Sequence, residues 1–276
     1  MPARIDHNAP LKQIQRNLGL HQAEAARAIE HLSSGQRVER SSDDPASLFL
    51  ADSFTAEIRA FAEGNRNAQQ GIGMLQVVDS SLGQMSEVIQ RLQTLAVQAA
   101  TGLFKEEERG SIDREVQLLK DELDRIAGST LYNGAPLLQA DRRVAVQTGP
   151  SAASSRDFIE LEFRDMRARG PFLNIGALTV GTIQDAGEAI SQLRLVEEKV
   201  SGERNRIAAF QNRLELSSST STLAIQRLRE TESAVRDIDM ARAVTDMTRA
   251  QILSQAAASF AVEADADIDR VLSLLQ

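Results

Sequence analysis

The chain of 276 residues has no cysteine, no tryptophan and a single tyrosine. The absence of cysteine excludes disulfides and any Cys/His catalytic or metal site, and it suits a protein destined for an oxidising exterior. Aromatic residues make up only 4% of the chain, so a thick globular core is poorly supplied. Hydrophobic residues still reach 42%, mainly as Ala, Leu, Ile and Val. This composition predicts long, thin helical layers in which small side chains let backbones approach closely.

The chain also lacks a long basic run, and its net charge is -8. Both observations argue against nucleic acid or an anionic membrane surface as a partner. The uncharged stretch 250–262 is too short to span a bilayer, so we expect no membrane insertion. The first ten residues have no apolar segment typical of a secretory signal peptide. We therefore expect that export from the cell, if it occurs, needs no cleaved signal.

Apolar stripes are present at both ends of the chain. In the first thirty-odd residues, apolar and small side chains recur at alternating steps of three and four, as in a heptad seam: Leu11, Ile14, Leu18, His21, Ala25, Ala28 and Leu32. Near the other end, 250–262 carries no charge and includes three consecutive alanines. Such faces can be buried only against each other or against further copies of the chain. The pattern therefore predicts a protein that polymerises.

Five helices are expected, over 10–32, 46–101, 105–128, 185–235 and 239–264. Asp44 and Pro45 supply start signals for the second helix, and Thr182 with Asp185 supplies them for the fourth. The fourth helix carries small or apolar residues at a strict interval of seven: Ala186, Leu193, Val200, Ile207, Leu214, Ser221, Leu228 and Val235. An acidic break at 265–269 is expected to end the fifth helix.

Two segments alternate with a period of two, 143–147 and 159–163, which predicts a β-hairpin, with a third strand near 172–175. The predicted fold is mainly α: a long antiparallel coiled-coil-like helical bundle with a small β-hairpin region and paired N- and C-terminal helices. Gly64, Gly71, Gly73 and Gly83 fall inside the second helix. They either admit close neighbours or simply weaken the helix, and the sequence leaves this open.

Several ordered segments resemble bacterial flagellin. They are Leu32-Ser33-Ser34-Gly35 with Ser42-Asp43-Asp44, Gln90-Arg91-Leu92, Glu122-Leu123-Asp124-Arg125-Ile126-Ala127 with Tyr132-Asn133-Gly134, Gln211-Asn212-Arg213-Leu214-Glu215, Met247-Thr248-Arg249-Ala250-Gln251-Ile252-Leu253 and Val271-Leu272-Ser273-Leu274-Leu275. The resemblance covers nearly everything outside 141–181, in the same order.

This resemblance implies a secreted, extracellular structural subunit that polymerises into the flagellar filament used for motility. It implies type III export and termini that fold on assembly. The inner-tube domain would comprise 1–42 and 239–276, and the rod domain 43–238, with the hairpin insert at about 141–181. The implied inner-tube packing residues are Leu11, Ile14, Leu18, Leu32, Met247, Ile252, Leu253, Phe260, Leu272 and Leu275.

The resemblance also implies partners: an export chaperone, cap and hook-associated proteins, and a toll-like innate receptor. In the receptor-recognition patch of flagellins, Arg91, Leu95 and Glu115 occupy matching positions, as receptor or inter-subunit contacts, whereas Gln93 and Thr94 replace the usual Arg and Glu. The run from Ser42 to Ala46 also resembles hook–filament junction proteins, so a junction protein is the alternative function.

No residues suggest catalysis, a metal or a cofactor. The three histidines, His7, His21 and His31, are too widely spaced to form a ligand set. The aspartates at 265, 267 and 269 imitate half of a calcium loop, but Arg270 and Gln276 stand where its glycine and glutamate should be. We therefore expect a structural protein with no enzyme activity.

Overall fold

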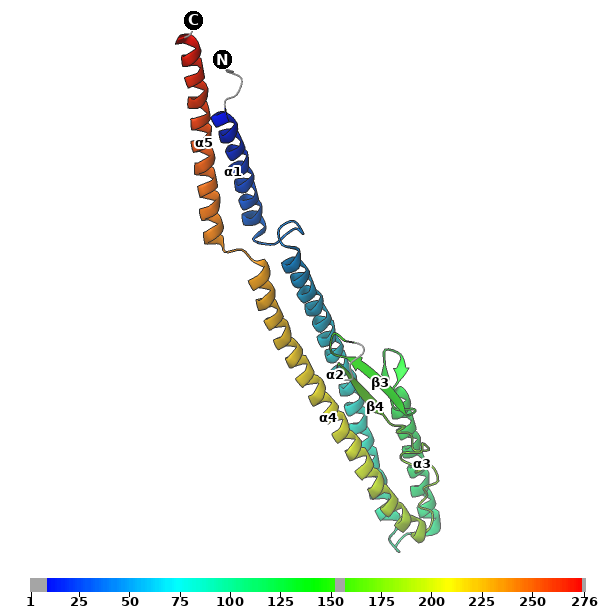
Figure 1. Cartoon of the computed structure of the whole chain (residues 1–276). Helices are drawn as coiled ribbons and strands as arrows, with labels where there is room; N and C mark the ends of the chain where they lie inside the picture. The colour runs from blue at the N-terminus through cyan, green and yellow to red at the C-terminus, as the bar shows by residue number, and fades with distance from the viewer. Residues whose placement is uncertain (1–8, 152–156, 275–276) are drawn as a thin grey trace. The chain divides into compact units, whose positions relative to one another are not determined.

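The computed structural model describes residues 9–151 and 157–274. Its elements in chain order are α1 (Ala9–Ser34), α2 (Pro45–Ala99), α3 (Glu106–Ser129), β1 (Leu131–Tyr132), β2 (Ala135–Pro136), β3 (Arg142–Gln147), β4 (Phe158–Phe163), α4 (Ile183–Arg236) and α5 (Met240–Leu274) (Figure 1). The mainly helical fold with a small antiparallel hairpin is confirmed.

The predicted helix start signals act as caps. The Asp44 side chain accepts hydrogen bonds from the backbone N–H groups of Ala46 and Ser47, both at 3.1 Å. The hydroxyl of Thr182 accepts one from the N–H of Asp185, also at 3.1 Å. Each cap satisfies backbone donors that a helix leaves unpaired in its first turn.

Two local expectations are wrong. Residues 172–175 form no strand; they lie in a loop whose Leu173 and Ile175 are buried, so their apolar character serves the core. The acidic segment 265–269 does not end α5, which continues to Leu274. That segment contains neither glycine nor proline, and surface acids alone do not stop a helix.

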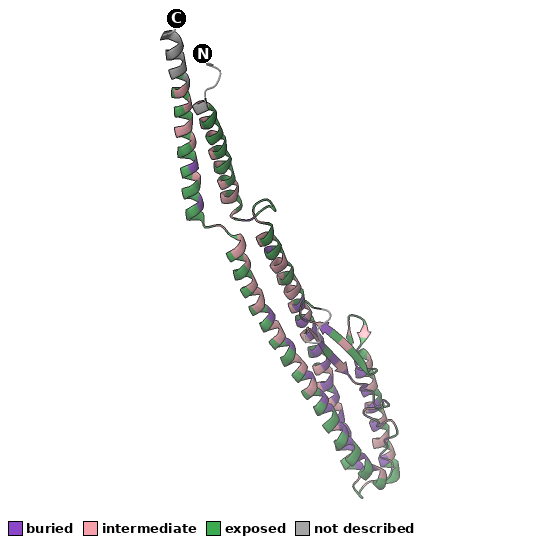
Figure 2. Cartoon of the chain, in the orientation of Figure 1, coloured by how far each residue is buried: buried purple, intermediate pink, exposed green. Residues whose placement is uncertain are grey.

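The chain divides into two compact units. Unit 1 comprises Met1–Ala56 with Arg227–Gln276, and unit 2 comprises Glu57–Gln226. Buried residues are concentrated in unit 2, while the helices of unit 1 are mostly exposed or half-buried (Figure 2). This division reflects packing within one chain, so the expected functional boundaries at 42/43 and 238/239 stay a prediction.

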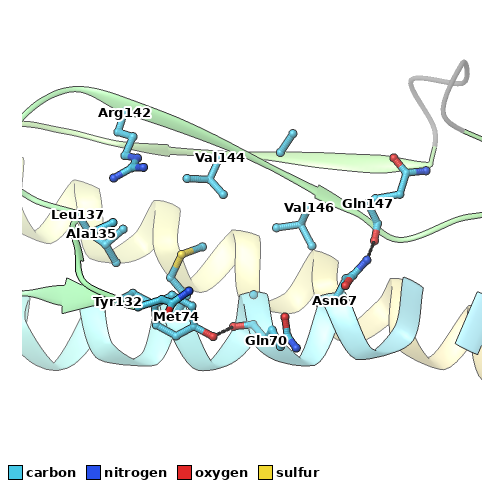
Figure 3. Close-up of a pocket in the computed structure, with 13 residues that line it drawn as sticks. Asn67, Gln70, Met74, Tyr132, Ala135, Leu137, Arg142, Val144, Val146 and Gln147 are labelled. Carbon is cyan, nitrogen blue, oxygen red and sulfur yellow. Dashed lines mark hydrogen bonds between the residues drawn. The ribbon is translucent and has the colours of Figure 1, made fainter. Parts of the chain in front are cut away.

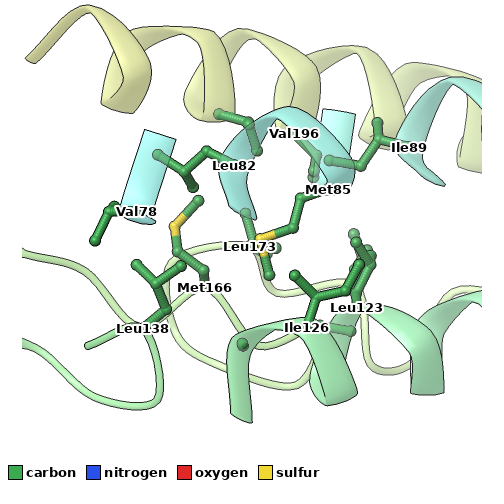
Figure 4. Close-up of a cluster of buried hydrophobic side chains, with 14 of the residues drawn as sticks. Val78, Leu82, Met85, Ile89, Leu123, Ile126, Leu138, Met166, Leu173 and Val196 are labelled. Atoms are coloured by element: carbon green, nitrogen blue, oxygen red, sulfur yellow. The ribbon is translucent and has the colours of Figure 1, made fainter. Parts of the chain in front are cut away.

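In unit 2, α2 and α4 run antiparallel, and α3 is the third helix of the bundle. The antiparallel register is marked by hydrogen bonds from the side chain of Asn65 to Thr222, of Arg204 to Asp79, and of Gln93 to Glu197. The heptad positions predicted on α4 from Ala186 to Ser221 are buried. The core is almost wholly aliphatic, as the composition predicted: it includes Val78, Leu82, Met85, Ile89, Leu123 and Val196 (Figure 4).

The β3–β4 hairpin packs on α2, and two of the four α2 glycines lie at close contacts: Gly64 with the residue after β3, and Gly71 with α4 and β3. A Cβ atom on Gly64 would lie 2.4 Å from the carbonyl oxygen of Thr148. On Gly71 it would lie 3.0 Å from Leu214 and 3.5 Å from Val146. Farther along, the hairpin and α2 enclose a cleft into which Val144 and Val146 point (Figure 3). Gly64 and Gly71 therefore admit close neighbours, a role the sequence could not assign.

A loop over 164–182 follows the hairpin and is fixed by polar side chains of α3. Asp113 and Asp124 accept hydrogen bonds from the N–H groups of Val180 and Ala168, at 2.8 and 2.7 Å. The buried ammonium of Lys120 donates to the carbonyl oxygens at 176 and 178. These backbone groups have no partner in a β-sheet or helix, and the bonds satisfy them. Burying them unpaired would be costly.

Asp165 in this loop gives a prediction for acid stability. Its side chain is 5% exposed and receives two hydrogen bonds from the Arg167 guanidinium, at 2.9 and 2.7 Å, and one from the Arg167 N–H. The guanidinium holds the pKa of Asp165 below its usual 3.8. Because the pKa of Asp165 is lower in the folded than in the unfolded protein, its charged form stabilises the fold at any pH above the unfolded-state pKa. This stabilisation is lost as the pH falls through the folded-state pKa.

We expect Asp165→Asn to lower the free energy of unfolding at pH 7 by about 1–3 kcal/mol. The deficit should shrink when unfolding is repeated at successively lower pH below about 4. A deficit that stays constant down to pH 2 would show that the charge of Asp165 is not what stabilises the loop.

Candidate inter-subunit packing surface

In unit 1, α1 and α5 form an antiparallel pair. The end of α1 meets the start of α5, where the N–H of Ile238 donates to the carbonyl of Gly35 at 3.1 Å. Ile14, early in α1, lines the same groove as Phe260, late in α5. The predicted pairing of the N- and C-terminal helices is thus present.

Apart from Met247, the residues of α5 at the seam with α1 are small. Half-buried or buried positions on α5 recur at steps of four and three: Ala243, Met247, Ala250, Ser254, Ala257, Ala261 and Ala264. Ala243 and Ala250 are the most deeply buried, at 6% and 5% exposed. On α1 the predicted seam residues Leu11, Ile14, Leu18 and Leu32 are half-buried. The heptad seam is therefore used within the chain.

Large apolar side chains of α5 lie outside that seam. Ile252, Leu253 and Phe260 are 60%, 42% and 61% exposed, and on α1 Leu20 and Ile29 are 61% and 50% exposed. In a helix pair that stood alone, the large residues would be expected at the seam and the small ones outside. On α5 this arrangement is reversed, so Ile252, Leu253 and Phe260 stay exposed on the surface of the helix pair, together with Leu20 and Ile29 of α1.

A groove runs along one flank of the pair. Ile14 and His21 of α1 and Leu253 and Phe260 of α5 line it, and it encloses about 480 Å³. A second hollow on α5 has Val244, Ile252 and Leu253 in its wall. Leu253 borders both hollows, so it lies at the centre of the exposed apolar surface.

The fully buried core of unit 1 is small. Its buried apolar residues within the described segments are Val38, Ala51, Ala243 and Ala250, none larger than valine. At about 25 cal/mol per Å² of apolar surface, such small side chains offset little of the conformational entropy lost on folding. Unit 1 therefore has few fully buried apolar side chains within the described chain.

A backbone clamp joins the helix breaks of unit 1. The N–H of Arg37 donates to the carbonyl of Arg236 at 2.7 Å, and its guanidinium donates to the carbonyl of Val235, also at 2.7 Å. Gly35 ends α1 with a positive φ of 70°, a conformation that glycine adopts without strain. The Leu32-Ser33-Ser34-Gly35 motif thus encodes the helix end, whereas the clamp left no periodic signal in the sequence.

The expected receptor patch lies in unit 2. Arg91 and Glu115 form an exposed ion pair, with 2.6 Å between Nη2 and Oε1. Leu95 is 2% exposed and belongs to the core, so its side chain is not available to a partner. Gln93 donates to the carboxylate of Glu197 at 2.8 Å. The three matching positions therefore do not form one continuous contact surface.

Two of the expected residues cannot be placed. Leu275 lies outside the described residues, and so does the side chain of Leu272.

Across the described segments, no group of three or more His, Cys, Asp or Glu residues could hold a metal ion. His21 contacts Glu24, and His31 contacts the carbonyl of Gln36. Among the described helices, none has the length and hydropathy needed to cross a membrane.

The chain resembles known proteins over its whole length. Residues 5–142 match the family described as "Bacterial flagellin N-terminal helical region", and residues 186–275 match "Bacterial flagellin C-terminal helical region". Flagellin FlaB2 of Treponema pallidum is 33% identical, over 99% of both chains. A flagellin of Halalkalibacterium halodurans is 32% identical, and the flagellar filament 33 kDa core protein of Treponema phagedenis 33%, again over 99% of both chains.

Solved structures with a similar fold are known. A putative flagellar hook-associated protein from Vibrio parahaemolyticus is similar with a TM-score of 0.57 over 71% of this chain and 100% of that chain. At 14% identity, this likeness concerns the fold alone.

Proposed function

The chain belongs to the bacterial flagellin family, and from this membership and the exposed apolar surface of unit 1 we propose that α1 and α5 form the inter-subunit core of its filament. The protein is a structural subunit of the extracellular flagellar filament. The observation that carries the proposal is the inverted packing of α5: alanines at the seam with α1, and Ile252, Leu253 and Phe260 turned outward.

The inner-tube contacts are assigned on this basis. Ile252, Leu253 and Phe260 contact neighbouring subunits, while Leu11, Ile14, Leu18, Leu32 and Met247 form the pair to which those neighbours dock. Leu272 and Leu275 are assigned to the same surface from the sequence pattern. The functional division of the chain then places 1–42 and 239–276 in the inner tube and 43–238 in the rod domain.

Folding of the termini is coupled to assembly in this proposal. Helices α1 and α5 contain 26 and 35 residues. Ordering them costs about 1–2 kcal/mol of backbone entropy per residue. The few small side chains buried within unit 1 cannot offset this cost, whereas several neighbouring copies can. The helical termini correspond to the assembled state, and the dilute monomer has unfolded ends that suit export through a type III channel.

We propose no catalytic activity for the protein. Its membership of the family suggests an export chaperone, a cap and hook-associated proteins as partners. A toll-like innate receptor would meet the Arg91–Glu115 ion pair but not Leu95, so its recognition of this chain is expected to be weak. Relatives matched over full length bear flagellin and filament names, which favours the filament subunit over a hook–filament junction protein.

Seeded polymerisation tests the proposed function. Purified protein is mixed with short fragments of sheared filament and followed by electron microscopy. We expect long helical filaments, because the contacts between different surfaces do not close into a ring. Preparations that stay as compact single particles with structured tails at high concentration would overturn the assignment.

A further inference from the structure

The chain contains a single Asn-Gly pair, Asn133-Gly134, and it forms the turn of the short β1–β2 hairpin. Both residues have a positive φ, 50° and 76°, as in a type I′ turn. Both are exposed. Within the described residues, neither the side-chain amide of Asn133 nor the N–H of Gly134 makes a hydrogen bond. Water therefore has access to this pair, and its reacting groups are free.

An asparagine followed by glycine is chemically labile. The backbone nitrogen of the following residue loses its proton to solvent and attacks Cγ of the asparagine side chain. A five-membered succinimide ring forms, and the side-chain nitrogen leaves as ammonia. Water then opens the ring at either of its carbonyls, which yields aspartate or isoaspartate. Glycine favours ring closure because it has no Cβ to hinder the approach.

Ring closure requires rotation of the Asn133 backbone out of the turn conformation, and the hairpin permits this locally. Strands β1 and β2 contain two residues each, and a hairpin this short is marginally stable. Pro136 has no N–H to donate to Leu131, its partner in the register. The N–H of Leu137 donates to the carbonyl of Thr130 at 3.1 Å and closes the base of the hairpin. The turn can therefore open while the buried Leu137 stays in the core.

Asn174 provides a matched comparison within the same chain. It is also exposed, and it has a positive φ of 53°. The residue after it, Ile175, is 1% exposed, and its N–H donates to the carbonyl of Ala168 at 2.9 Å. The nitrogen that would attack Asn174 is therefore held by the core, and a β-branched side chain stands beside it.

We propose that Asn133 is a site of spontaneous modification, where deamidation through an opened β1–β2 turn converts the neutral amide into a carboxylate. Aspartate at this position keeps the turn, because Asp-Gly is favoured in type I′ turns as Asn-Gly is. Isoaspartate adds a methylene to the backbone, so the two-residue turn no longer matches the strand register. The site belongs to unit 2 of a single chain, so the proposal does not depend on assembly of the filament.

The new carboxylate would lie in a cleft that holds an unpaired cation. Asn133 and Arg142 both line the cleft between α2 and the β3–β4 hairpin, and Arg142 extends over one end of it (Figure 3). The Arg142 side chain donates to the carbonyl of Pro136 at 3.3 Å. It has no carboxylate within ion-pair distance among the described residues. The fold should therefore tolerate the aspartyl form.

Peptide mapping of the full chain by mass spectrometry tests the site. Purified protein is aged in mildly alkaline buffer and digested with trypsin, which places Asn133 and Asn174 on different peptides. We expect the Asn133 peptide to give two acidic products at least ~10-fold faster than the Asn174 peptide, because Asn174 reacts only after Ile175 leaves the core. Protein isoaspartate methyltransferase, used as a probe, should label the aged wild type but not aged Asn133→Gln.

The same incubation in denaturant is the control for the turn. Both asparagines are then free of tertiary structure, and Asn133 should still convert faster because glycine follows it. If Asn133 converts in denaturant but not in the folded protein, the turn protects it and the proposal is overturned. Equal rates at Asn133 and Asn174 in the folded protein, or no conversion of Asn133 in either state, would also overturn it.

The variant Asn133→Asp tests whether the aspartyl product keeps the turn. As an exposed substitution that suits the turn, it should leave the Tm within roughly 2–4 °C of wild type. A larger fall would contradict the retained turn. None of these measurements requires polymerisation, so failure of the filament proposal and failure of the modification site are distinguishable.

Discussion

Replacement of Leu253 by aspartate is expected to abolish filament growth and leave unit 2 folded. Leu253 is 42% exposed in the single chain and borders both hollows on α5, so a neighbour that covers this surface would bury the new carboxylate without a partner. Burial of an unpaired charge costs several kcal/mol. At 1.4 kcal/mol per factor of ten, the critical concentration should rise at least ~100-fold.

The matched control is Leu253→Met, which keeps the size and the apolar character of the side chain. It should polymerise within a few-fold of wild type. Pelleting measures the critical concentration, and thermal unfolding of the monomer checks that unit 2 is intact. If Leu253→Asp forms normal filaments, the surface of α5 around Leu253 does not contact neighbouring subunits.

Gly64→Ala adds a single methyl group. We expect it to destabilise unit 2 more than any other substitution of that size. The new Cβ would lie 2.4 and 2.6 Å from the carbonyl oxygen and carbon of Thr148, both backbone atoms that cannot rotate away. The hairpin must move off α2, or the helix must bend. Overpacking of this kind costs about 1–3 kcal/mol, which should lower the Tm of unit 2 by roughly 3–10 °C.

Gly73→Ala is the control on the same helix, because no atom lies within 4 Å of its added Cβ. Alanine is favoured over glycine in a helix by about 1 kcal/mol, so this variant should raise the Tm by roughly 2–4 °C. Calorimetry of both variants separates close packing from helix propensity. If both substitutions shift the Tm in the same direction, the close approach of the Thr148 backbone does not determine which side chain is tolerated at position 64.

The fold could be predicted largely from periodicity. The seven-residue repeat on α4 from Ala186 onward and the alternation around Val144 each report which face is buried, and the structure buries those faces. The loop over 164–182 could not be predicted in the same way. Its conformation depends on side chains of α3, such as Asp113 and Lys120, that bond to backbone groups. A bond to a backbone group imposes no residue type on the partner, so it leaves no pattern.

The candidate surface was partly predictable. The sequence identified the apolar residues of α1 and α5 but not which of them face each other. Ala243, Met247 and Ala250 have the same three- and four-residue spacing as the apolar residues of α1. Only the structure shows that this narrow stripe forms the seam and that Ile252 and Phe260 face outward. The resemblance to the receptor patch likewise did not reveal that Leu95 is buried.

The central claim is that α1 and α5 become stably helical only when copies of the chain cover their apolar faces. Amide hydrogen exchange measured by mass spectrometry on dilute monomer and on filaments tests it directly. We expect amides over 11–32 and 243–262 to exchange rapidly in the monomer and to be strongly protected in the filament, with the unit 2 core protected in both. Strong protection over 11–32 in the dilute monomer would contradict the claim.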